Sequence, residues 1–104
     1  MTVKPSTAYN RLNKLLWLGR LPAATIKFLD NETIPRCYGL TLFDQDFARP
    51  VIFLNADEKK WGRTLLHECL HVAEPQLPHG IVFEKLVNSY WRYARKHIKQ
   101  LRGL

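Results

Sequence analysis

The residues with the clearest chemical potential are His67, Glu68 and His71, which spell H-E-x-x-H within the stretch "WGRTLLHECLHVA". The apolar spacing of this stretch predicts a helix, on which side chains four positions apart lie one turn above each other. Both imidazoles can therefore bind one metal ion, while Glu68 reaches a water molecule beside that ion without being a ligand. A zinc ion acidifies such a water, and the carboxylate takes its proton and passes it on. The pattern thus predicts a hydrolytic zinc site with Glu68 as the general base.

A catalytic zinc ion takes three protein ligands and keeps one position open, so a third ligand must come from elsewhere in the chain. The side chains that can supply it are His79, Glu74, Glu84 and Cys37. We prefer His79, because it ends the proline-punctuated loop "PQLPHG", which can turn the chain back toward the helix. Glu84 is also a candidate for contacting the site from outside the ligand set. The metzincin pattern is excluded, since it needs Gly and His at positions 74 and 77, where this chain has Glu and Leu.

The elements that must position these residues are indicated by hydrophobic spacing and turn residues. A helix capped by Ser6 and ended by "GRLP" precedes three stretches with strand character, "ATIKFLD", "RCYGLTLFD" and "RPVIFLN". The helix with the histidines then extends from about Lys59 to Val72, and a long last helix extends from about Phe83 to Leu101. Strands that cluster rather than alternate with helices predict the α+β class, with residues 1–104 forming one domain.

Composition limits the classes of protein to consider. The hydrophobic content of 46% and the aromatic content of 12% indicate a folded globule. No apolar run has the length of a signal-peptide core or a membrane span, so we expect a cytoplasmic protein without a membrane partner. Two cysteines are too few for a disulfide framework.

The net charge of +7 is unevenly distributed along the chain. Segments 1–29 and 85–104 together contain eleven basic residues and no acidic one, whereas residues 30–84 contain nine acidic against five basic residues. Basic end segments of this kind indicate contact with DNA or another polyanion. The residues that we expect to make this contact lie on the last helix: Arg92, Arg95, Lys96 and Lys99.

The stretch "TLLHECLHVAEPQLPHGIVF" resembles the core of the SprT-like zinc metallopeptidases, in which H-E-x-x-H is followed by a short loop and H-G-x-x-F. His79, Gly80 and Phe83 match the second half of that pattern, and the preceding "RPVIFLN" matches the apolar strand that ends in Leu-Asn in this family. The similarity extends from about Cys37 to Tyr93. With only two cysteines, the chain would be a minimal member without the four-cysteine zinc ribbon that several relatives carry.

The resemblance implies a minimal zincin fold, a Zn²⁺ ion bound by His67, His71 and His79, and Glu68 as the general base. It also implies a protein or peptide substrate that pairs with an edge strand of the sheet. We expect that edge strand around Val51 to Asn55, with Val51, Phe53 and Asn55 contacting the substrate. A DNA-associated protein is the substrate class that the family suggests, and a bacterium or a bacteriophage is the source that a chain of this size suits.

Two other functions fit the same residues. One is a basic nucleic-acid-binding protein with a structural or vestigial zinc site, in which Glu68 has no chemical role. The other is a zinc amidohydrolase that acts on a small amide, as peptide deformylases do, although "PRCYGLT" around Cys37 does not match that family's signature. In a peptidase or an amidohydrolase, a hydroxyl group could stabilise the oxyanion of the reaction, and Tyr90 and Tyr93 are the candidates.

Overall fold

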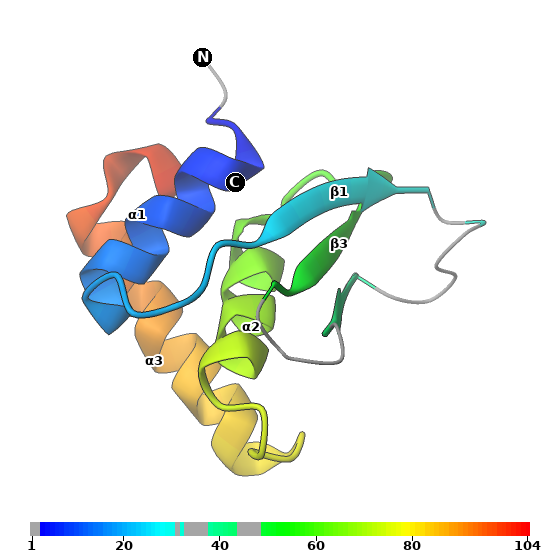
Figure 1. Cartoon of the computed structure of the whole chain (residues 1–104). Helices are drawn as coiled ribbons and strands as arrows, with labels where there is room; N and C mark the ends of the chain where they lie inside the picture. Colours follow the sequence, from blue (N-terminus) through cyan, green and yellow to red (C-terminus); the bar gives the residue numbers. More distant parts are fainter. Residues whose placement is uncertain (1–2, 31, 33–37, 44–48) are drawn as a thin grey trace.

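The structure is a computed structural model that describes residues 3–30, 32, 38–43 and 49–104 (Figure 1). The elements along the chain are α1 (Pro5–Trp17), β1 (Thr25–Leu29), β2 (Gly39–Leu42), β3 (Val51–Asn55), α2 (Gly62–Ala73), α3 (Ile81–His97) and the short 3-10 helix η1 (Lys99–Leu101). This arrangement confirms the predicted α+β class. Among the described residues, every helix is too short or too polar to span a lipid bilayer.

The three strands form one mixed sheet in the order β1-β3-β2. β1 runs parallel to β3 with Ile26 opposite Ile52, and β2 runs antiparallel to β3 with Thr41 opposite Ile52. The prediction that Val51–Asn55 is an edge strand is therefore wrong. Both edges of β3 are used by its two neighbours, so its backbone cannot pair with a substrate, and the edge positions belong to β1 and β2.

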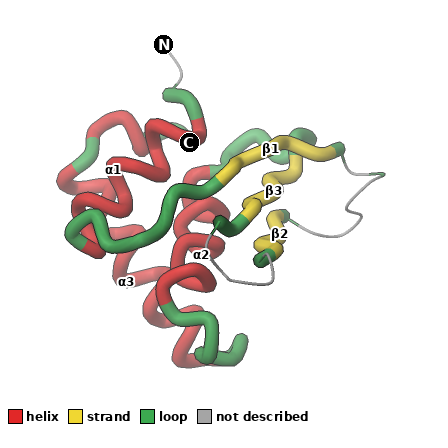
Figure 2. The backbone as a smooth tube through the Cα atoms, in the orientation of Figure 1, coloured by secondary structure: helices red, strands yellow, loops and turns green. Residues whose placement is uncertain are grey.

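The helices lie together on one side of the sheet, and α2 is the central one (Figures 1 and 2). α2 contacts β2, β3, α1 and α3. The core between these elements is apolar and fully buried; it includes Ala8, Leu12, Ile52, Leu54, Leu65, Leu66 and Cys69. Each buried leucine or isoleucine contributes about 1.5–3 kcal/mol of burial free energy, so this cluster holds α2 firmly against the sheet.

Side-chain bonds to the backbone fix the turn between α1 and β1. The helix begins at Pro5 with Lys4 as its N-cap residue, so the predicted cap at Ser6 is wrong. The amide of Asn13 accepts a hydrogen bond from the backbone N–H of Leu21 at 3.0 Å and donates one to the Leu21 carbonyl at 3.2 Å. These two hydrogen bonds close the turn between α1 and β1.

The C-terminal segment folds back against the start of α2. The predicted last helix ends earlier than expected, at His97, because Ile98 adopts an extended conformation before η1. This break turns Leu101 and Leu104 into the core, and the Gly62 N–H at the start of α2 donates to the Leu104 oxygen at 2.8 Å. The N-terminal end of the helix that carries the histidines is thus fixed by the last residues of the chain.

Candidate metal centre

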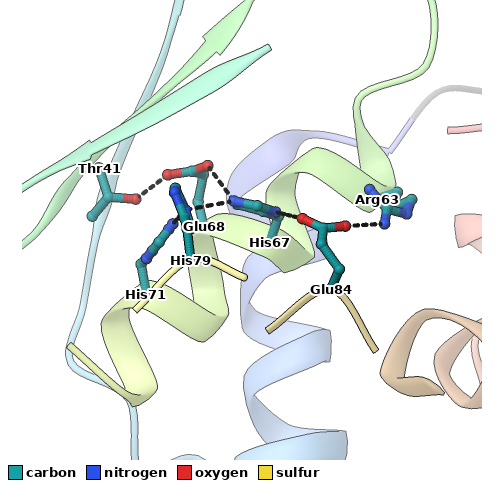
Figure 3. A network of polar contacts seen from close by, with 7 residues as sticks. All are labelled: Thr41, Arg63, His67, Glu68, His71, His79 and Glu84. Carbon is teal, nitrogen blue, oxygen red and sulfur yellow. Dashed lines mark hydrogen bonds and ion pairs between the residues drawn. The ribbon is translucent and has the colours of Figure 1, made fainter. Parts of the chain in front are cut away.

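Two elements bring three histidines together. His67 and His71 lie one turn apart on α2, and His79 lies at the end of the loop between α2 and α3 (Figure 3). The Nε2 atom of His79 is 3.3 Å from Nε2 of His67 and 2.6 Å from Nε2 of His71. One ligand atom from each of the three histidines lies within 4.8 Å of the others. The structure therefore brings together the three residues that the sequence predicted as metal ligands.

The donor set suits zinc. Zn–N bonds of about 2.0–2.1 Å in a tetrahedron place two ligand nitrogens about 3.3 Å apart. The separation between His67 and His79 already has that value, and the shorter separation between His71 and His79 would widen on binding. Burial lowers the pKa of His67, and it lowers the pKa of His71 to about 4, with the other two imidazoles adding to the effect on His71. Both side chains are therefore neutral at pH 7, which is the form that binds metal.

Phe83 forms an apolar floor beneath the three histidines. Its ring is fully buried, and its centroid lies 4.7 Å from that of His67, 4.5 Å from that of His71 and 5.1 Å from that of His79. Leu70 and Val87 pack beside it in a small buried cluster. The phenylalanine of the H-G-x-x-F stretch thus supports all three imidazoles from one side and restricts their movement.

Glu68 lies beside the histidines with its carboxylate buried. Its Oε2 atom is 4.0 Å from Nε2 of His67, and its Oε1 atom accepts a hydrogen bond from the hydroxyl of Thr41 at 2.6 Å. Burial raises the pKa of Glu68 to about 7, although the bond from Thr41 acts in the opposite direction. A carboxyl group with this pKa can both accept and release a proton near neutral pH.

A glycine in β2 allows this strand to approach the Glu68 side chain closely. A Cβ atom on Gly39 would lie 2.7 Å from Cγ2 of Thr64 and 3.4 Å from Cγ of Glu68. No larger residue fits there unless the Thr64 side chain or β2 shifts. The sequence analysis did not name Gly39 and Thr41 as neighbours of Glu68, and their shared face on β2 is the signal that could have found them.

Glu84 contacts the far side of His67, away from the other two imidazoles (Figure 3). Its Oε1 atom is 3.6 Å from Nδ1 of His67, and its Oε2 atom forms an ion pair of 2.9 Å with Arg63. Arg63 also donates to Oδ1 of Asn88 at 2.7 Å. Glu84 therefore lies near the Nδ1 edge of His67, and the Nε2 edge of the same ring is the one near His79.

Among the described residues, the other candidate ligands are not part of the histidine group. The group of three histidines includes neither Glu74, which is exposed at the end of α2, nor Glu84. Cys37 lies outside the described residues. Cys69 is fully buried in the core.

Hollows border the histidines along β2. One of about 260 Å³ is lined by Leu40, Thr41, Glu68 and the three histidines, among others. A second of about 310 Å³ contains Tyr38, Arg63, His67, Glu68 and Glu84. The strand next to the site is thus β2, whereas none of the three residues predicted to bind substrate from β3 lines either hollow. The Asn55 side chain is buried and accepts a hydrogen bond from the Asp57 N–H at 2.9 Å, which is a turn contact.

The tyrosines predicted as oxyanion donors lie away from the centre. Tyr90 packs against Trp17 with ring centroids 6.0 Å apart, and Tyr93 stacks on His97 at 4.2 Å. Neither lines the hollows that contain Glu68. Tyr38, immediately before β2, does line the hollow that contains His67 and Glu68, and it is 65% exposed. Its hydroxyl is therefore a better candidate for the oxyanion donor than those of Tyr90 and Tyr93.

The basic residues predicted to contact nucleic acid are all exposed at the C-terminal end of the chain. Arg92, Arg95 and Lys96 lie on α3, and Lys99 begins η1. The guanidinium carbon of Arg95 lies 6.0 Å from the centre of the Trp91 ring. Arg92, Arg95 and Lys96 fall within about one turn near the end of α3, whereas Lys99 lies beyond the extended Ile98.

No protein-family model, no curated protein and no solved structure matches this chain.

Proposed function

We propose that this chain is a zinc-dependent metallopeptidase of the SprT-like type. The observation that carries the proposal is the convergence of three imidazole Nε2 atoms beside the buried carboxylate of Glu68. Structural zinc sites fill all four positions with protein ligands, whereas three histidines leave one position open. A buried carboxylate with a raised pKa next to that open position fits hydrolysis rather than a purely structural role.

His67, His71 and His79 would hold the ion. When bound, zinc supplies Lewis-acid activation of a water molecule and of the substrate carbonyl. Glu68 takes the proton from the attacking water and returns it to the nitrogen of the leaving amine. The hydroxyl of Thr41 keeps the carboxylate of Glu68 oriented during both transfers, and Phe83 holds the imidazoles in place.

An extended peptide is the substrate class that suits the surroundings. β2 is an edge strand, and Thr41 in its middle contacts Glu68, so a peptide paired with β2 passes the carboxylate. The strand proposed for substrate binding is therefore β2 rather than β3, and the pairing is still that of an extended peptide with a strand edge. It also favours a peptide over the small formylated amide of a deformylase.

The test combines metal content with a single conservative substitution. We expect about one zinc per chain by elemental analysis of the purified protein, and loss of that zinc in His79→Ala. Glu68→Gln should keep the zinc and abolish hydrolysis of a casein-derived peptide mixture. A folded protein that binds no added zinc, or a Glu68→Gln variant that cleaves at the original rate, would overturn the proposal.

We also propose that the exposed cations on α3 and η1 contact DNA, which would bring DNA-associated proteins to the site. The support is the exposure of Arg92, Arg95, Lys96 and Lys99 on a segment without acidic residues after Glu84. Binding to a duplex oligonucleotide should weaken steeply with salt, because each neutralised phosphate releases counterions. Lys96→Glu with Lys99→Glu should abolish it, while Lys4→Glu with Lys14→Glu, an equal change of charge on and before α1, should weaken it less.

A further inference from the structure

A basic cavity lies beside the N-terminal end of α2, outside the metal centre. It has a volume of about 360 Å³, and its walls include Tyr38, Lys60, Arg63, Trp91 and Arg95. Leu101 and Leu104 also line it, and both are almost fully buried. The chemistry assigned to the three histidines and Glu68 does not use this cavity.

The basic cavity is continuous with the metal centre. It shares Tyr38, Arg63 and Thr64 with the 310 Å³ hollow, which itself contains His67 and Glu68. Arg63 precedes His67 by four residues on α2, which corresponds to about 6 Å along the helix axis. An extended peptide covers that distance in about two residues, so a substrate held at Glu68 reaches the cavity with its second or third residue.

The charges that line the basic cavity are mostly positive. Lys60 and Arg95 have no carboxylate within 4.0 Å among the described residues, whereas Arg63 is paired with Glu84. Glu58 is the one acidic residue in the walls. The balance favours an acidic side chain and disfavours a basic one, and the partly exposed ring of Trp91 suits the methylene groups of a glutamate.

The orientation of the peptide depends on its pairing with β2, which we take as antiparallel because β2 itself pairs antiparallel with β3. A chain paired antiparallel to β2 enters near Leu42 and leaves near Gly39, next to Tyr38. The residues after the scissile bond therefore point toward the basic cavity. We propose that this cavity is a specificity site that binds an acidic side chain, aspartate or glutamate, at the second or third residue after the scissile bond. The proposal rests on the peptidase function proposed above.

The first test uses a peptide library that contains all residue types at each position. The zinc-loaded protein is incubated with the library, and mass spectrometry identifies the cleaved bonds. We expect enrichment of Asp and Glu, and depletion of Lys and Arg, at the second or third residue after the cleaved bond. For one cleaved peptide with Glu, Gln or Lys at that position, kcat/KM should fall in this order by about threefold to tenfold per step, and the differences should shrink at high salt.

Charge reversal in the cavity provides the matched comparison. Lys60→Glu with Arg95→Glu should invert the order and make the Lys peptide the best substrate. Lys60→Glu with Arg92→Glu should keep half of the original preference, since Arg92 is an exposed arginine on α3 that does not line the cavity. Equal rates for the Glu, Gln and Lys peptides, with peptide cleavage intact, would overturn the specificity site and leave the peptidase function standing.

A binding measurement separates the two proposals if no peptide is cleaved. The zinc-loaded Glu68→Gln variant is titrated with a fluorescein-labelled Glu-containing peptide and with its Lys counterpart, and anisotropy is recorded. Preferential binding of the Glu peptide that is lost in Lys60→Glu/Arg95→Glu supports the cavity even when the peptidase function fails. Equal binding of both peptides, or a preference for the Glu peptide that Lys60→Glu/Arg95→Glu leaves unchanged, would overturn the proposal.

Discussion

The two faces of α2 differ in what their side chains contact, although the residues of both faces are interspersed along the same helix. One face carries Leu65, Leu66 and Cys69, which are fully buried in the core. The opposite face carries His67 and His71, which are held by specific atoms from other elements. The core face depends on volume and apolarity, whereas the site face depends on individual contacts. Stability and chemistry should therefore respond to different substitutions, which gives four predictions.

The largest effect is expected for Glu68→Gln on the site face. Glutamine keeps the shape of the side chain and the contact with Thr41 but cannot accept a proton. Hydrolysis should fall about 10²–10⁴-fold, while zinc content and melting temperature stay unchanged, since the substitution removes only the general base. Peptide hydrolysis, elemental analysis and circular dichroism on one preparation check this outcome. A loss of folding instead would mean that Glu68 belongs to the structural face.

Leu66→Ala tests the core face of the same helix. The leucine is fully buried, so its truncation should lower the free energy of unfolding by about 2–5 kcal/mol. Urea unfolding of the metal-free protein measures the change. Zinc per folded chain and the rate of hydrolysis per folded chain should not change. A comparable loss of zinc from the folded variant would contradict the separation of the two faces.

Gly39→Ala tests the close contact between β2 and α2. The added methyl group would lie 2.7 Å from Cγ2 of Thr64 and 3.1 Å from the Phe53 carbonyl oxygen, so we expect the strand to shift, at a cost of about 1–3 kcal/mol. Because the shift also moves Thr41 away from Glu68, hydrolysis should fall together with stability. Thr64→Ser removes the obstructing Cγ2 atom, and the double variant should recover part of both losses. No recovery would place the cause elsewhere.

The smallest effect is expected for Glu84→Gln, outside the ligand set. The carboxylate is half exposed and 3.6 Å from His67. Its loss should weaken zinc binding by about tenfold, which is the lower end of the range for residues that contact metal ligands. Competition with a fluorescent zinc chelator measures the affinity. Glu74→Gln is the matched control, because Glu74 is also close to the site in sequence but lies outside the histidine group. Equal effects of both substitutions would indicate a general loss of negative charge rather than a contact with His67.

Much of the site could be predicted because its central residues share one helix. The four-residue spacing of His67 and His71 follows from helical periodicity alone, and it does not depend on how α2 packs. The same holds for Cys69, whose position within the motif directs it to the core. The α+β class followed from the order of apolar stretches. His79 was chosen from a loop bounded by prolines, and the structure places it against both helical histidines.

What the sequence could not determine depends on pairing between distant segments. The order β1-β3-β2 places Val51–Asn55 in the middle of the sheet, although the local pattern of an apolar strand is the same at an edge and in the centre. Thr41 reaches Glu68, and Glu84 reaches His67, only because β2 and α3 pack on opposite sides of one α2 face. Spacing along a helix is a local property of the chain, and the sequence alone determined it. The neighbours of that helix depend on contacts between residues far apart in the chain, and only the tertiary structure decided them.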